Sequence, residues 1–122
     1  MKYMLLIYMA ENALNEEQRQ HCYQESTELA HQLHAKGQLL ATAPLQPVST
    51  ATSVRVRDGH RLVTDGPYAE TREHLGGYFL VNARNLDEAI DVAGRIPGAR
   101  TGTVEIRPVL EIPNHPLEGG SI

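Results

Sequence analysis

The sequence has little of what secreted and membrane proteins depend on. Its 122 residues contain one cysteine, Cys22, so no intramolecular disulfide can form and a reducing, cytoplasmic location is expected. No run approaches the roughly 20 apolar residues that a membrane helix requires. The apolar N-terminal run over residues 1–10 is too short for a signal peptide with its flanks, and Glu11 follows it directly. We therefore expect no membrane partner.

Positive charge is also scarce. The chain has 11 Lys and Arg residues against 15 Asp and Glu residues, which gives a net charge of -4. The densest basic group, Arg55, Arg57 and Arg61, alternates with other residues as on the solvent face of a strand. Binding to phosphate backbones requires clustered basic residues, so we expect no nucleic-acid partner.

Sequence motifs for cofactors and metals are missing. There is no Gly-rich phosphate loop, no nucleophile elbow and no Cys-x-x-Cys pair, so no cofactor is expected. His31 and His34 share one flank of a predicted helix, but a zinc site needs further ligands and none is indicated, so we expect no metal. Cys22, without a neighbouring base in sequence, is interpreted as a small core residue.

Hydrophobic residues make up 41% of the chain, which predicts a packed globular domain rather than disorder. We assign one domain to residues 1–112 and a flexible C-terminal tail to residues 113–122, which carry prolines and glycines without a periodic pattern.

Apolar periodicity and turn residues predict the order strand, helix, strand, hairpin, strand, helix, strand. Asn15 with Gln18 three residues later is a helix start, Gly37 is a helix end, and Asp58-Gly59 is a hairpin turn. Within the first helix Tyr23 is expected to face inward, and within the second Leu86 and Ile90. The predicted elements are strands 2–9, 38–43, 52–57, 61–64, 77–83 and 103–109 and helices 16–36 and 86–95.

With the hairpin set aside, this order is βαββαβ, an α+β fold of the ferredoxin-like type with an inserted hairpin. Two helices cover one face of such a sheet and leave the other face open. The apolar first strand, together with Val104 and Ile106, indicates that the second face is buried as well. A second copy of the chain is the economical cover, so we expect a homodimer with a barrel-like core.

Chemistry-bearing side chains are concentrated in residues 65–81, between the hairpin and a buried strand. Asp65 and His74 are candidates for an acid/base pair, and Pro67, Tyr68 and Glu70 for ligand contacts. The alternative is a structural turn in which Asp65 caps backbone N–H groups and His74 is solvated.

At this loop the sequence resembles the YCII-related family, and within it the DGPF-domain branch. The resemblance runs in order over about residues 1 to 110, and Tyr68 replaces the Phe that gives the branch its name. The matching segments are MKYMLLIY at 1–8, TSVRVRDG at 52–59, TDGPYAET at 64–71, LGGY at 75–78, LDEA at 86–89 and VEIRPV at 104–109.

The resemblance implies a dimeric ferredoxin-like α/β-barrel with one cleft per subunit. It also implies an enzymatic His–Asp pair, with the Asp at the position of Asp65 and the His on the first helix. That His position falls near Ser26 in this chain, so Ser26 becomes a ligand-binding candidate and His74 the candidate base. Members of the branch often occur beside extracytoplasmic-function sigma factors, which implies a regulatory setting.

Two functions stay open from the sequence. One is a small-molecule lyase or isomerase that uses Asp65 in acid/base chemistry. The other is a non-catalytic dimeric module that binds a small ligand or a protein and is linked to sigma-factor regulation.

Overall fold

The computed structural model describes residues 1–116, which form a four-stranded antiparallel sheet, a separate two-stranded hairpin and three helices. The sheet has the strand order β2-β5-β1-β6, and β3 pairs only with β4. The strands are β1 Lys2–Met9, β2 Leu39–Pro44, β3 Thr52–Arg57, β4 His60–Asp65, β5 His74–Asn82 and β6 Thr103–Pro108. The helices are α1 Glu16–Ala35, α2 Leu86–Arg95 and α3 Gly98–Thr101, and a short 3₁₀ turn spans Val48–Thr50.

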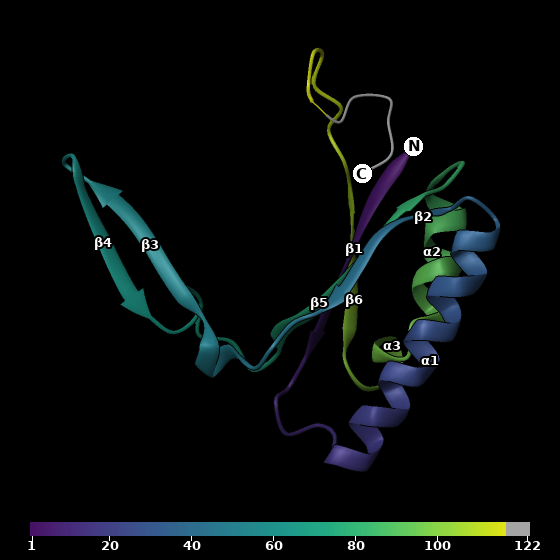
Figure 1. Ribbon diagram of the computed structural model, residues 1–122, viewed down its shortest axis with the longest axis horizontal. Helices are drawn as coiled ribbons and strands as arrows, with labels where there is room; N and C mark the ends of the chain where they lie inside the picture. The colour runs from purple at the N-terminus through teal and green to yellow at the C-terminus, as the bar shows by residue number, and fades with distance from the viewer. Residues whose placement is uncertain (117–122) are drawn as a thin grey trace.

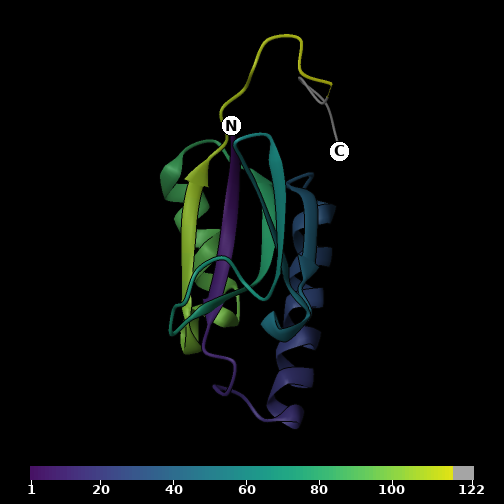
Figure 2. The same ribbon diagram turned by 90° about the vertical axis from the view of Figure 1, so that its left-hand side faces the viewer.

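The arrangement is α+β and compatible with the ferredoxin-like fold. The two central strands are β1 and β5, and the α1 and α2 connections each link strands that are not neighbours in the sheet. The helices lie on one face of the sheet, and the hairpin leaves from the other side (Figure 1). In Figure 2, which views the molecule from that other side, the hairpin overlaps the sheet and so stands in front of it.

Local sequence explains where the two long helices begin and end. The Asn15 side chain accepts a hydrogen bond from the Gln18 backbone N–H at 2.8 Å, and the Asn15 N–H donates to Gln18 Oε1 at 2.9 Å. Asn85 caps α2 in the same way at 3.0 Å from the Glu88 nitrogen. Gly37, with a φ of 71°, follows the end of α1, as a left-handed C-terminal residue does. The sequence-based helix starts are therefore confirmed.

The core lies between the sheet and the helices. Leu5 and Val81 from the two central strands are fully buried, as is Leu33 from α1. The rest of the buried cluster consists of Tyr3, Leu29, Phe79, Ala83, Ala89, Val92, Ala93 and Ile96.

Two packing expectations were wrong, and one was only partly right. Leu86 and Ile90 of α2 are 51% and 49% exposed, because the helix turns Ala89, Val92 and Ala93 to the sheet instead. Tyr23 of α1 does lie on the sheet side of its helix, but it is 38% exposed because it lines an open space there instead of packing on the core.

The other wrong expectation concerns the second sheet face. Val104 and Ile106 pack against the helix-side core, so they do not indicate burial of the helix-free face. That face carries the alternate residues of β1, namely Met4, Leu6 and Tyr8, which are partly exposed.

The short helix α3 was not predicted from the sequence, and the ends of several elements differ by one residue from those predicted. The start of β5 and the C-terminal tail differ in other ways. Strand β5 begins at His74 rather than at residue 77, because Leu75 and His74 still pair with β1 beyond an irregularity at Ile7/Tyr8. Of the tail expected over residues 113–122, residues 113–116 continue the chain past β6 with a turn, and residues 117–122 lie outside the described part.

Gly102 is required where α3 turns into β6. A Cβ at this position would overlap the backbone carbonyl oxygen of Tyr8, which cannot move without disturbing β1. We expect Gly102→Ala to lower the free energy of unfolding by about 2 kcal/mol or more, as measured by urea unfolding. The matched control is Gly94→Ala, because a Cβ on Gly94 meets nothing within 4 Å and sits in α2. It should stabilise the protein by about 0.5–1 kcal/mol. Equal effects of the two changes would contradict this account.

Candidate functional site

A groove of about 970 Å³ lies between α1 and the sheet. Such a volume is in the range of small-molecule sites. Its sides are the inner flank of α1, the ends of β1 and β2, the start of β5 and the connection after β2. We call this hollow the groove. Its apolar side chains include Ile7, Met9, Leu14, Ala30, Leu39, Leu45, Val48, Leu75 and Phe79.

The composition of α1 produces the groove. The buried side chains of this helix are Leu29 and Leu33, both in its C-terminal half. The first half, Glu16 to Ser26, is almost entirely polar and has only Cys22 and Tyr23 to offer the sheet. A helix that is held at one end and has no large apolar residues at the other leaves space against the sheet.

Two hydrogen bonds between a side chain and the main chain, and one within the main chain, tie the open end of the groove together. Glu11, after β1, accepts a hydrogen bond from the Val48 N–H at 3.2 Å, and the Leu45 N–H donates to the Gly76 carbonyl at 2.8 Å. Arg19 of α1 donates to the Glu11 carbonyl at 3.5 Å. The β1–α1 connection and the segment after β2 are thereby held side by side at the groove.

Most of the groove's surface is apolar, but polar and charged side chains also line it, above all from α1. They include Glu11, Glu16, Arg19, Gln20, Thr27, Thr42 and Gln46. Ser26, His31 and His34 line it from the helix, and His74 lines it from the start of β5. Across residues 1–116, no buried side-chain nitrogen or oxygen lacks a hydrogen-bond partner. The groove therefore offers adaptable hydrogen-bonding groups along mostly apolar walls.

Cys22 also lines the groove, and it is protected rather than activated there. Burial raises the pKa of the Cys22 thiol, and the negative charge of Glu25 raises it further. Arg100 and a hydrogen bond with Ser26 act in the opposite direction but are weaker. A thiol with a raised pKa is a poor nucleophile, in agreement with its interpretation as a packing residue.

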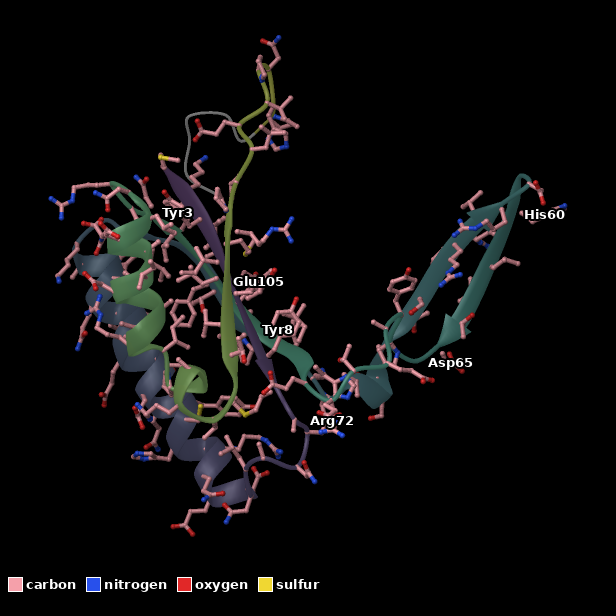
Figure 3. The ribbon with its side chains drawn as sticks, turned by 180° about the vertical axis from the view of Figure 1, so that it is seen from behind. Tyr3, Tyr8, His60, Asp65, Arg72 and Glu105 are labelled. Atoms are coloured by element: carbon pink, nitrogen blue, oxygen red, sulfur yellow. The ribbon has the colours of Figure 1, made fainter. Side chains whose placement is uncertain are left out.

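The predicted site residues do not all meet. Ser26 and His74 both line the groove, whereas Asp65, Pro67, Tyr68 and Glu70 do not. Asp65 is the exposed last residue of β4, and Figure 3 shows it out on the hairpin, apart from Tyr3 and Tyr8 of the sheet. Within residues 1–116, no side-chain hydrogen bond or ion pair joins Asp65 to His74.

The turn around Asp65 is closed by its neighbours. The Gly66 N–H donates to the Ala51 carbonyl at 2.8 Å, and the Ser53 hydroxyl donates to the Gly66 carbonyl at 2.8 Å. Tyr68 packs back on the hairpin, with the Arg55 guanidinium carbon 4.9 Å from its ring centroid. The Asp65 carboxylate is not spent on this turn and stays available at the surface.

The sequence reading missed the segment 45–48 and the inner flank of α1 as groove residues. Pro44 and Pro47 had marked this segment only as irregular. The polar first half of α1 was the available signal, because a helix with so few apolar residues cannot pack closely.

No metal or membrane feature accompanies the groove. His31 and His34 both line it, yet no three His, Cys, Asp or Glu side chains gather in a metal-binding arrangement in the described chain. Among the helices of residues 1–116, none has the length and apolar character that crossing a membrane demands.

Comparison with known families decides the relationship. The YCII-related domain matches residues 1–113, almost the whole chain. The chain belongs to the YCII-related domain family. It is also 33% identical over 114 residues to a protein of Rhizobium meliloti (strain 1021), covering 89% of this chain and 92% of that protein. That relative is itself described as uncharacterized, so the likeness carries no reaction with it.

Proposed function

We propose that this YCII-related protein binds a small amphipathic molecule in the groove. The observation that carries the proposal is the unfilled, mostly apolar space beside α1, which also has hydrogen-bonding side chains along its walls. Ligand sites of proteins have this composition, because apolar walls supply affinity and a few polar groups fix orientation. Ser26 of α1 and His74 of β5 both line the groove and are among the groups that would select the ligand.

Filling the groove tests this function. Ser26→Phe puts a ring into the space and should weaken binding of the apolar fluorophore anilinonaphthalene sulfonate by about tenfold or more. The measurement is a fluorescence titration, with circular dichroism to check the fold. Gln24→Phe is the matched control, because Gln24 is exposed on α1 and does not line the groove. Undiminished binding by Ser26→Phe would rule out the groove as the site.

Acid/base catalysis is the second candidate, and it includes the lyase or isomerase reading. The observation in its favour is that Asp65 is exposed and free of side-chain hydrogen bonds within residues 1–116, while His74 lies in the groove. Asp65 can reach a ligand in a groove only if the hairpin extends to the groove of a second copy or changes its position on its own chain. The carboxylate would then take a proton and the imidazole would return it.

Ligand binding and catalysis can be measured separately with a compound that binds in the groove and that the protein converts. Asp65→Asn should then lower kcat by about 100-fold or more while leaving the binding of the compound unchanged, because only the proton acceptor is lost. Single-turnover kinetics and equilibrium titration measure the two quantities. Asp58→Asn, at the hairpin turn, is the control for a loss of charge alone. An unchanged kcat in Asp65→Asn would exclude the catalytic role.

A homodimer through the helix-free face of the sheet is also part of this proposal. Its support is that Met4, Leu6 and Tyr8 stand on that face with no helix over them. While this face is in contact with solvent, the protein lacks the stabilisation that burial of each of these apolar side chains gives. A second copy restores that burial by symmetry, because each face then covers the other.

Leu6→Lys tests the dimer. Leu6 pairs with Glu105 across β1 and β6, so a lysine there has an acidic neighbour in the monomer, which should keep its fold. In the dimer the charge is buried, and the dissociation constant should rise by about tenfold or more. Analytical ultracentrifugation measures it. Ile90→Lys is the control. Ile90 is an exposed residue of α2, so this change should leave the dimer intact. A dimer unaffected by Leu6→Lys would place the interface elsewhere.

A further inference from the structure

The β3–β4 hairpin, residues 52–65, projects from the body of the protein, and we call it the arm. Every residue of β4 is exposed, and so is every residue of β3 except Ser53, which is partly exposed. None of its residues belongs to the buried core. Figure 1 shows the arm standing apart from the sheet on the side opposite the helices.

The register of the arm places its three valines on one face, which they share with Thr52, Arg61 and Asp65. Residues paired directly across two antiparallel strands point to the same side. Val54 pairs with Val63, and Val56 pairs with Arg61, so the three valines share a face with Asp65, which pairs with Thr52. Val54, Val56 and Val63 are 59%, 61% and 58% exposed. The opposite face carries Arg55 and Leu62, with the ring of Tyr68 against Arg55.

An isolated two-stranded hairpin is at best marginally stable in water. The turn of the arm is favourable, since Asp58 and Gly59 have the positive φ values of 51° and 76° that a tight hairpin turn uses. The turn does not cover the valines, however. Three exposed β-branched residues on one face of a hairpin make that face a candidate contact surface.

The position and charge of the arm point to a second copy as its partner. The arm and the helix-free sheet face lie on the same side of the molecule, so they border one space (Figures 1 and 2). A partner seated there by a two-fold axis meets the arm and presents its own arm in return. The arm holds three of the 11 basic residues and two of the 15 acidic residues, so its net charge is +1 and the rest of the chain has -5. The arm of one copy is thus attracted to the body of the other.

We propose that the arm packs its Val54–Val56–Val63 face on a second copy of this chain and thereby fixes the groove. This rests on the dimer in the proposed function but adds a contact that the sheet face alone does not supply. One of the two segments that join the arm to the sheet is also a groove wall, because residues 45–48 line the groove. The other segment leads into β5, whose first residues, 74–77, line the groove too. Holding the arm therefore holds the groove's open end, and dimerisation and ligand binding become linked. The partner's body is required for a complete site.

The arm face is tested by single substitutions that keep strand propensity. Val63→Thr and Val54→Thr are isosteric and lose only apolar character, and each should raise the dimer dissociation constant by about tenfold. Leu62→Thr is the matched control, because Leu62 precedes Val63 and lies on the opposite face. The dissociation constants come from analytical ultracentrifugation. A larger effect of Leu62→Thr than of Val63→Thr would overturn the assignment of the face.

Cross-linking tests the contact without relying on the stability of the arm. Benzoylphenylalanine at position 63 should give a covalent dimer on irradiation, whereas the same group at position 62 should give little. No covalent dimer from position 63 would overturn the proposal.

The same variants separate this inference from the proposed function. If Leu6→Lys dissociates the dimer but Val63→Thr and Val54→Thr do not, the arm contact is excluded while the sheet-face dimer stands. The linkage is measured by titrating anilinonaphthalene sulfonate into Val63→Thr below and above its dimer dissociation constant. Weakened binding that recovers at high protein concentration supports the linkage. Equal binding in monomer and dimer overturns the linkage but leaves the groove as the ligand site.

Discussion

The structure depends on a shortage of apolar side chains in the first half of α1. The buried residues of this helix are Leu29 and Leu33, and they hold it against the sheet. Its capping box fixes where it starts, but capping contributes nothing to the contact with the sheet. The helix is therefore well formed along its whole length and closely packed along only part of it. The space left under the unpacked part is the groove.

A second shortage concerns the cover of the sheet. Helices α1 and α2 lie on the same face, which leaves the apolar residues of β1 on the other face without a helix. The arm leaves toward this uncovered side and brings three more exposed valines. One monomer thus presents two incomplete apolar surfaces that face a common space. A single symmetric partner is the simplest way to complete both of them.

The candidate chemistry is divided between these two regions. His74 and Ser26 lie in the groove, and Asp65 lies on the arm, on the same face as the valines. The position of the Asp65 carboxylate therefore depends on where the arm docks. The groups that could act together belong to parts of the molecule that one copy keeps apart.

The sequence alone determined most of the secondary structure, the α+β class and the family relationship, but not α3 or the start of β5. Helix caps at Asn15 and Asn85 and the Asp58-Gly59 turn are local interactions, so they can be read without knowledge of the fold. Only the tertiary structure decided that Ile90 is exposed and Val104 faces the helices, because inward and outward directions depend on how each element is rotated against its neighbours. The same holds for Asp65 and His74, whose closeness in sequence gave no contact in space. The arm separates them because its strands pair with each other instead of joining the sheet.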